Sequence, residues 1–159
     1  MVFVVLCMIQ TQDNEICFSQ YFNSIFNICF YDLNEKKVKS SISKINCYYN
    51  SFRTFNMITK DLLVIGGEDK IFIINVNQYN IVRIIEVLKS NITAFCMLNE
   101  NMFLTGDNNG IIRQWKIEED NLILISKKEK AHDNYIYALI KLGDEHVVSC
   151  SLDKSIKIW

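Results

Sequence analysis

The chain has 159 residues, of which 50% are hydrophobic and 22% are charged. This balance predicts one packed domain and excludes wholesale disorder. A formal net charge of −1 gives no overall attraction to nucleic acid or to a membrane surface, so we expect neither as a partner. The absence of proline and the count of five glycines exclude a collagen-like or proline-rich protein.

The segment from Val2 to Ile9 is the first apolar run of the chain. A helix that spans a bilayer needs roughly 20 apolar residues, so this run is too short to cross a membrane. It could serve as the apolar part of a secretory signal, but such signals begin with positive charge, and no basic residue precedes Lys36. A buried strand is the preferred interpretation, with the signal peptide as the alternative.

Short apolar runs separated by polar turns continue along the chain and predict β-strands. In the last full unit these runs are residues 122–126, 135–142, 146–151 and 155–159. They are shorter than the ten or so periodic residues that an amphipathic helix needs. The sequence therefore predicts an all-β chain.

Two tryptophans, Trp115 and Trp159, mark an internal repeat of 44 residues. When the sequence is shifted by this distance, the 26 residues that end at each tryptophan align without a gap. Two earlier and weaker copies place Ile74 and Tyr31 at the position of the tryptophan. The four markers are spaced by 43, 41 and 44 residues, close to the length of a four-stranded propeller blade.

Residues 132–159 carry the most specific pattern of the chain. Its four members are His132, Ser149, Asp153 and Trp159. This stretch resembles one repeat of the WD-repeat β-propeller family, which has a Gly-His pair, a Ser-Gly-Ser run, an Asp and a final Trp-Asp pair. The chain departs from the family at Ala131 and Cys150, which stand in place of glycines, and no Asp follows the last Trp.

The resemblance, the strand pattern and the repeat predict an all-β fold. We expect a partial β-propeller of about four four-stranded antiparallel blades, the last blade lacking its outer strand. It should form one domain over residues 1–159, with the last strands of the blades near residues 28–32, 71–76, 111–117 and 155–159. Because family members usually close with about seven blades, we expect an arc that another chain or a missing segment completes. A closed ring of four blades is the alternative.

The resemblance also implies a hydrogen-bonded network among His132, Ser149, Asp153 and Trp159. In it the Asp carboxylate accepts from the imidazole, and the Ser hydroxyl links the imidazole to the indole. Ser, His and Asp together also suggest a hydrolase triad, so a propeller enzyme with its active site at the central channel remains the alternative. No nucleophile elbow, phosphate-binding loop or zinc-protease motif is present, and we expect no enzymatic activity.

The third repeat departs from this pattern, because Leu88 and Asn109 occupy the places of the His and the Asp. The network there should be absent or replaced by packing. Gly66, Gly67 and Gly106 lie where a strand meets its turn, and we attribute them to turn geometry.

The six cysteines lie mostly within apolar runs, and no two form a Cys-x-x-Cys pair. With only two histidines to add, the sequence predicts no metal site and no cofactor. We interpret the cysteines as small buried residues of a protein in the reducing cytoplasm.

Loops that lead into each blade and turns that precede each last strand should share one face of the propeller. The candidate partner-binding residues on this face are Lys89, Ser90, Asn91, Lys127, Lys128, Lys130, Asp133, Tyr135, Leu152 and Lys154. The opposite face receives Asp13, Glu15, Glu100, Glu118, Glu119, Asp120, Asp144 and Glu145.

The resemblance implies a non-catalytic interaction scaffold of the WD-repeat type, because the first face receives peptides in that family. Its lysines would suit an acidic or phosphorylated segment of a partner protein. The alternative, that these charges only solvate the loops, stays open. Glu129 and Asp133 lie among the lysines and argue against a nucleic-acid partner.

Overall fold

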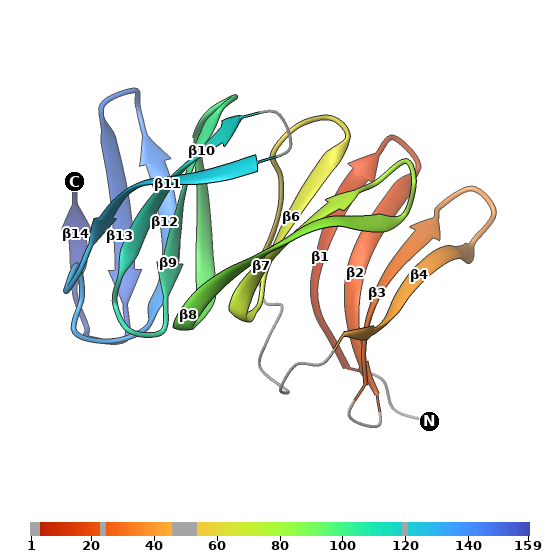
Figure 1. Cartoon of the computed structure of the whole chain (residues 1–159), viewed down its shortest axis with the longest axis horizontal. Helices are drawn as coiled ribbons and strands as arrows, with labels where there is room; N and C mark the ends of the chain where they lie inside the picture. Colours follow the sequence, from red (N-terminus) through yellow and green to blue (C-terminus); the bar gives the residue numbers. More distant parts are fainter. Residues whose placement is uncertain (1–3, 23–24, 46–53, 119–120) are drawn as a thin grey trace.

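The structure is a computed structural model that describes residues 4–22, 25–45, 54–118 and 121–159. Throughout these ranges the chain forms strands and turns, which confirms the all-β prediction. Figure 1 shows the strands gathered into successive antiparallel sheets, from β14 on the left to β4 on the right. No helix in the described ranges has the length and apolar character needed to cross a bilayer.

The first sheet is built from the N-terminal strands in chain order. It contains β1 (Val4–Gln12), β2 (Glu15–Phe22), β3 (Ile25–Asp32) and β4 (Lys37–Ile45). The apolar run from Val2 to Ile9 falls in β1, and residues 1–3 lie outside the described part of the chain. The expectation that this strand is buried is wrong, because Val5 and Met8 are exposed and the residues between them are only half-buried.

The second and third sheets are joined by one long strand, β8 (Asn80–Asn99). The second sheet also contains β5 (Thr54–Met57), β6 (Leu62–Gly66) and β7 (Glu68–Asn75). The third contains β9 (Met102–Asp107), β10 (Ile112–Glu118) and β11 (Asn121–Lys128). The first half of β8 pairs with β7 and its second half pairs with β9, so β8 is an outer strand of one sheet and the inner strand of the next.

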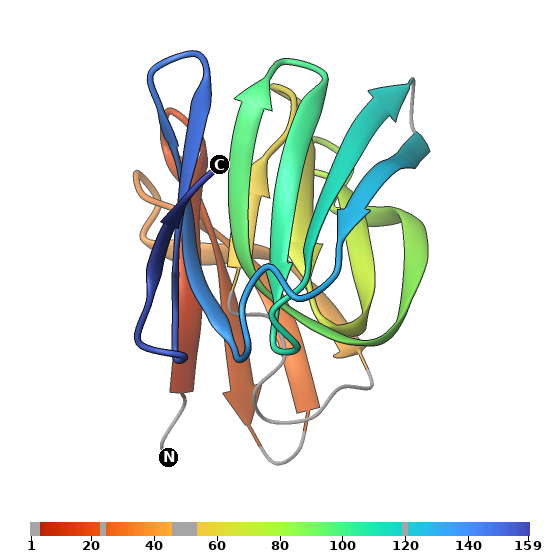
Figure 2. The ribbon, with the colours of Figure 1, turned by 90° about the vertical axis from the view of Figure 1, so that its left-hand side faces the viewer.

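The fourth sheet has three strands, β12 (Ile136–Leu142), β13 (His146–Ser151) and β14 (Ile156–Ile158). Among the described residues no strand pairs with the outer edge of β14. This strand is drawn in dark blue in Figure 2. The prediction of a partial propeller whose last blade lacks its outer strand is confirmed. The segments predicted as the last strands of the blades fall on β3, β7, β10 and β14. In the first three sheets these are third strands, because β4, the first half of β8 and β11 follow them as outer strands.

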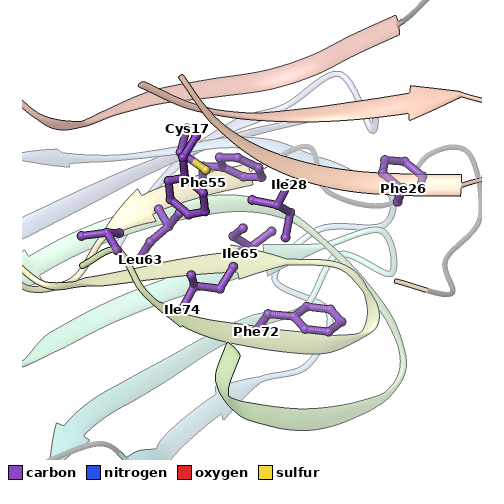
Figure 3. Packing of buried hydrophobic residues seen from close by; sticks show 10 residues of the cluster. Cys17, Phe26, Ile28, Phe55, Leu63, Ile65, Phe72 and Ile74 are labelled. Atoms are coloured by element: carbon purple, nitrogen blue, oxygen red, sulfur yellow. The ribbon is translucent and has the colours of Figure 1, made fainter. Parts of the chain in front are cut away.

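Apolar residues at alternate positions of the strands build a core between each pair of neighbouring sheets. Figure 3 shows the first of these cores, where Phe26 and Ile28 of β3 face Ile65 of β6 and Phe72 of β7. Phe26 and Phe30 are fully buried, and each contributes about 1.5–3 kcal/mol relative to an exposed side chain. Two further clusters follow, between the second and third sheets and between the third and fourth.

The innermost strands of the four sheets are β1, β5, the second half of β8, and β12. Each of these strands contacts the next, so the sheets fan around a shared axis. This arrangement gives the repeated units of the sequence equivalent places in the fold.

Gly66 and Gly106 mark a close approach that recurs from sheet to sheet. A Cβ on Gly66 would lie 2.7 Å from Ile92, and one on Gly106 would lie 2.7 Å from Ile136. Neither glycine has a positive φ, so the expectation that turn geometry explains them is wrong. They are needed because an isoleucine of the next inner strand packs directly on their backbone.

Candidate functional site

A hydrogen-bonded network links a loop, a turn and two strands of the fourth sheet. His132 in the β11–β12 loop places Nδ1 2.8 Å from Oδ2 of Asp153, which lies in the β13–β14 turn. Its Nε2 lies 2.6 Å from the hydroxyl of Ser149 on β13. The indole N–H of Trp159 donates to the same hydroxyl at 2.9 Å. The structure thus brings together all four residues that the resemblance implied.

Asp153 is held as a carboxylate by donors on two sides. One oxygen accepts from the hydroxyl of Ser155 at 2.6 Å and from its backbone N–H at 2.9 Å. The other accepts from the backbone N–H of Asp133 at 3.1 Å. These hydrogen bonds, that of the Ser155 hydroxyl first, lower the pKa of Asp153 below its usual range. With Nδ1–H of His132 donating to this carboxylate, Nε2 is left to accept from Ser149.

Ser149, His132 and Asp153 do not form a catalytic triad, because the Ser149 hydroxyl cannot reach a substrate. Ser149 is fully buried and His132 is 1% exposed. A hydrolytic serine must reach a substrate carbonyl beside donors that stabilise the oxyanion. The Ser149 hydroxyl instead lies between the imidazole and the indole of Trp159, so the geometry favours a structural role for the network.

The third sheet keeps the indole contact without the histidine. Trp115 donates its indole N–H to Thr105 at 2.9 Å, with the same ten-residue separation as the indole contact of the fourth sheet. Asn109, at the place of the Asp, donates from its side-chain amide to the backbone oxygen of Lys89 at 2.6 Å. The side chain of Leu88, at the place of the His, lies outside the described residues.

Asp107, Arg113 and Ser90 form a buried polar cluster that the sequence pattern did not reveal. Asp107 and Arg113 are almost completely buried and form an ion pair. The Ser90 hydroxyl donates to Asp107 and accepts from Arg113. The third repeat, whose network was expected to be absent or replaced by packing, therefore carries a buried ion pair that neither alternative included. The available signal was an Asp and an Arg six residues apart on either side of one turn.

Most of the candidate partner-binding residues lie at one end of the third and fourth sheets. They come from the bend of β8, the β11–β12 loop and the β13–β14 turn: Lys89, Asn91, Lys130, Asp133, Tyr135, Leu152 and Lys154. The backbone N–H of Leu152 donates to the oxygen of Tyr135 at 2.9 Å, which joins the turn to the loop. The backbone N–H of His132 donates to the oxygen of Gly110 at 3.0 Å, which joins the loop to the third sheet.

Three lysines of this end adopt left-handed backbone conformations. Lys89, Lys130 and Lys154 have φ values of 59°, 55° and 68°. This conformation costs an L-residue about 1–2 kcal/mol, so the surrounding hydrogen bonds must hold it. The amide of Asn109 fixes the carbonyl of Lys89, and the backbone N–H of Lys154 donates to the oxygen of Ser151 at 3.2 Å. The three exposed side chains are therefore presented from turns of defined conformation.

Some residues that the sequence analysis placed on the two faces lie elsewhere. Lys128 is the last residue of β11, and its Nζ lies 4.6 Å from the ring centroid of Trp159, between the third and fourth sheets. Ser90 is buried in the cluster with Asp107 and Arg113. Glu15, expected on the opposite face, is 3% exposed and accepts from the hydroxyl of Tyr79 at 2.7 Å.

No three His, Cys, Asp or Glu side chains of the described ranges come together in a way that could hold a metal ion. Cys17 and Cys96 are buried free thiols, and burial raises the pKa of both. Cys47, Glu119 and Asp120 lie outside the described residues.

Comparison with known proteins agrees with this architecture. The family model described as "WD domain, G-beta repeat" matches residues 125–159. A chain in the crystal structure of the mitotic checkpoint complex has a TM-score of 0.79 and 14% identity, covering 98% of this chain and 50% of that chain. The WD40 β-propeller domain of Doa1 has a TM-score of 0.77 and 13% identity, and the match covers 97% of this chain and 50% of that chain.

The chain thus spans about half the length of the solved structures that it matches. No curated protein matches its sequence. The family match covers the fourth sheet and its network, and the structural matches cover nearly the whole chain. Residues 125–159 are therefore similar to a WD40 repeat, and the chain as a whole has the fold of a partial β-propeller like those of the WD40 structures that it matches.

Proposed function

We propose that the chain is a non-catalytic interaction scaffold that binds proteins or peptides in the cytoplasm. The proposed binding face is the end of the third and fourth sheets that carries Lys89, Lys130 and Lys154. The observation that carries the proposal is the fixed link between the β11–β12 loop and the β13–β14 turn, made by the network and by the bond from Leu152 to Tyr135. A preorganised surface loses little conformational entropy when a flexible segment binds to it.

The chemistry of this face suggests the class of partner. Tyr135 and Leu152 are 39% and 47% exposed. Tyr135 lies in the same loop as Lys130, and Leu152 lies in the same turn as Lys154. An aromatic ring offers a large contact area at low entropic cost, and the ammonium groups favour negative charge. An acidic or phosphorylated segment with an apolar side chain therefore suits this face best. One structural neighbour belongs to a protein assembly, the mitotic checkpoint complex, which agrees with a scaffold role.

The test is selection of peptides from a display library against the chain, followed by binding measurements on variants. The binding-face variant carries alanine at Lys89, Lys130 and Lys154. A matched control with the same change in net charge carries alanine at Lys36, Lys37 and Lys60. We expect selected peptides to be rich in Asp and Glu and to bind the first variant at least tenfold more weakly. Equal binding to both variants would contradict the proposal.

We also propose that further sheets complete the ring, supplied by another chain or by a segment outside these residues. The face of the fourth sheet turned away from the third is apolar, with Ile140 and Leu142 of β12 more than half exposed. Exposed apolar patches of this kind mark surfaces that another protein element covers. Sedimentation of the 159-residue chain checks this, because a stable, well-folded monomer of 18.6 kDa would contradict it.

A further inference from the structure

The turn between β9 and β10 carries Asn109-Gly110, the only Asn-Gly pair of the sequence. Such a pair is chemically labile, because glycine has no side chain to shield its backbone nitrogen, which can attack the amide carbon of the preceding asparagine. The side chain of Asn109 is exposed to solvent, so water and a leaving ammonia molecule have access to it. The 44-residue repeat places Asp153 and Lys154 at the equivalent positions of the fourth sheet, where no side-chain amide is present.

Packing between the third and fourth sheets requires the glycine of this pair. Gly110 has a φ of 74°, but Lys154 adopts a φ of 68° at the equivalent position, so this conformation alone does not demand glycine. A Cβ on Gly110 would, however, collide with the backbone carbonyl of His132. The N–H of His132 also donates to the oxygen of Gly110 at 3.0 Å. The β11–β12 loop therefore packs on the bare backbone of Gly110, and the fold retains a glycine after Asn109.

Asn109 joins this turn to the bend of β8. Its side-chain amide donates to the backbone oxygen of Lys89 at 2.6 Å. Beside this contact, the N–H of Asn108 donates to the oxygen of Asn91 at 3.0 Å, and the N–H of Asn91 donates to the side-chain oxygen of Asn108 at 2.7 Å. The bond from Asn109 depends on the amide group, because a carboxylate has no proton to donate to Lys89.

We propose that Asn109 is a site of spontaneous deamidation whose rate is restrained by the folded turn. The nitrogen of Gly110 forms a bond with Cγ of Asn109, and the side-chain amide leaves as ammonia with the proton that this nitrogen loses. Water then opens the resulting succinimide ring at either carbonyl and yields aspartate or isoaspartate at position 109. The N–H of Gly110 donates to the oxygen of Asp107 at 3.3 Å, so the turn must open locally before the reacting nitrogen is released.

Either product weakens the junction between the turn and the bend of β8. An aspartate at position 109 would place an acceptor against the carbonyl oxygen of Lys89, which is itself an acceptor. Isoaspartate adds a methylene group to the backbone just before Gly110, whose oxygen accepts from His132. Both products also add a negative charge beside Lys89. The consequence of this charge rests on the proposed function: an aged chain should bind an acidic segment more weakly.

Timed incubation of the chain in mildly alkaline buffer, followed by peptide mass spectrometry, measures the conversion at each asparagine. Asn108 and Asn134 are the controls, because larger residues follow them in the sequence. We expect Asn109 to convert at least tenfold faster than either control, and faster still in guanidinium chloride, where the turn is open. Conversion no faster than that of Asn134 would overturn the proposal. Equal rates in buffer and in denaturant would overturn the restraint by the folded turn.

Two variants at position 109 connect the reaction to the structure. Asn109→Asp copies one product, whereas Asn109→Gln keeps an amide donor but closes a ring far more slowly. Hydrogen exchange at the amides of Asn91 and Asn108 reports the junction. We expect this exchange to be at least tenfold faster in Asn109→Asp than in the fresh chain. Ageing should bring the unmodified sequence toward the same rate and leave Asn109→Gln unchanged.

The remaining outcomes are decisive as well. Unchanged exchange in Asn109→Asp would overturn the effect on the junction, and faster exchange in aged Asn109→Gln would assign the change to another site. The mass measurement needs no binding partner. Deamidation at Asn109 can therefore be established even if the lysine face proves not to bind peptides, and failure of the two proposals can be told apart.

Discussion

At Gly106 the third sheet closely approaches the inner strand of the fourth, and Gly106→Ala tests how tightly the two sheets pack. The added Cβ would lie 2.7 Å from Cγ2 and 2.9 Å from Cβ of Ile136, well inside the roughly 3.5–4.0 Å at which carbon atoms pack best. Ile136 cannot easily move away, because it pairs with Ser151 and its carbonyl accepts from Thr93 at 2.5 Å. We expect the free energy of unfolding to fall by about 1–3 kcal/mol in urea denaturation.

A double-mutant cycle shows whether the loss arises at this contact. Ile136→Ala alone should cost about 2–5 kcal/mol, because it empties part of a filled core. The loss of stability in the double variant should be smaller than the sum of the two single losses by about 0.5–3 kcal/mol. The reason is that alanine at position 136 leaves room for the methyl group added at position 106. Gly143→Ala is the control: no atom lies within 4 Å of its added Cβ, its φ of 62° alone disfavours alanine, and its cost should add to that of Ile136→Ala. A neutral Gly106→Ala variant, or full additivity with Ile136→Ala, would refute the reasoning.

Three further predictions concern buried polar contacts within the third and fourth sheets, and urea denaturation checks each. Ser149→Ala and Thr105→Ala should each lower the free energy of unfolding by about 1–3 kcal/mol, because each leaves an indole N–H without its acceptor; a loss confined to one of them would contradict the equivalence of the two repeats. Arg113→Met should lower the free energy of unfolding by about 3–5 kcal/mol, because it leaves the buried Asp107 without its counter-charge. An unchanged free energy would show that the ion pair does not stabilise the fold. The lowered pKa of Asp153 means that its stabilising effect is full above the ordinary Asp pKa of about 3.9 and declines as the pH falls toward the folded-state value. In Asp153→Asn the free energy of unfolding should therefore fall less steeply between pH 6 and pH 2. An unchanged pH dependence would mean that other groups cause the loss of stability in acid.

The sequence was sufficient for the overall architecture because one pattern occurs several times. Short apolar runs exclude long helices, and a repeat of 44 residues with tryptophans at its ends requires equivalent sheets. The contact of His132 with Ser149 and Asp153 could be expected only through the family resemblance, because residues so far apart in the chain meet only once the fold is known.

The parts that the sequence did not predict depend on contacts between sheets. Alternation shows that a residue faces a neighbouring sheet, but it does not show what that residue meets there. The stacking of Lys128 on Trp159 is of this kind. The ion pair of Arg113 with Asp107 lies within the third sheet, across the β9–β10 turn, and only the fold shows that both side chains are buried there. The constraint on Gly106 is also of this kind, because it comes from a strand about 30 residues later in the chain rather than from its own turn.

Nuclear Overhauser contacts across the sheets test the central claim, that tandem units form successive equivalent sheets, most directly. We predict a strong contact between the α-protons of Gly66 and the methyl groups of Ile92, and an equivalent one between Gly106 and Ile136. These two contacts report the step from the second sheet to the third and the step from the third to the fourth. The absence of either, or different partners for the two glycines, would contradict the claim.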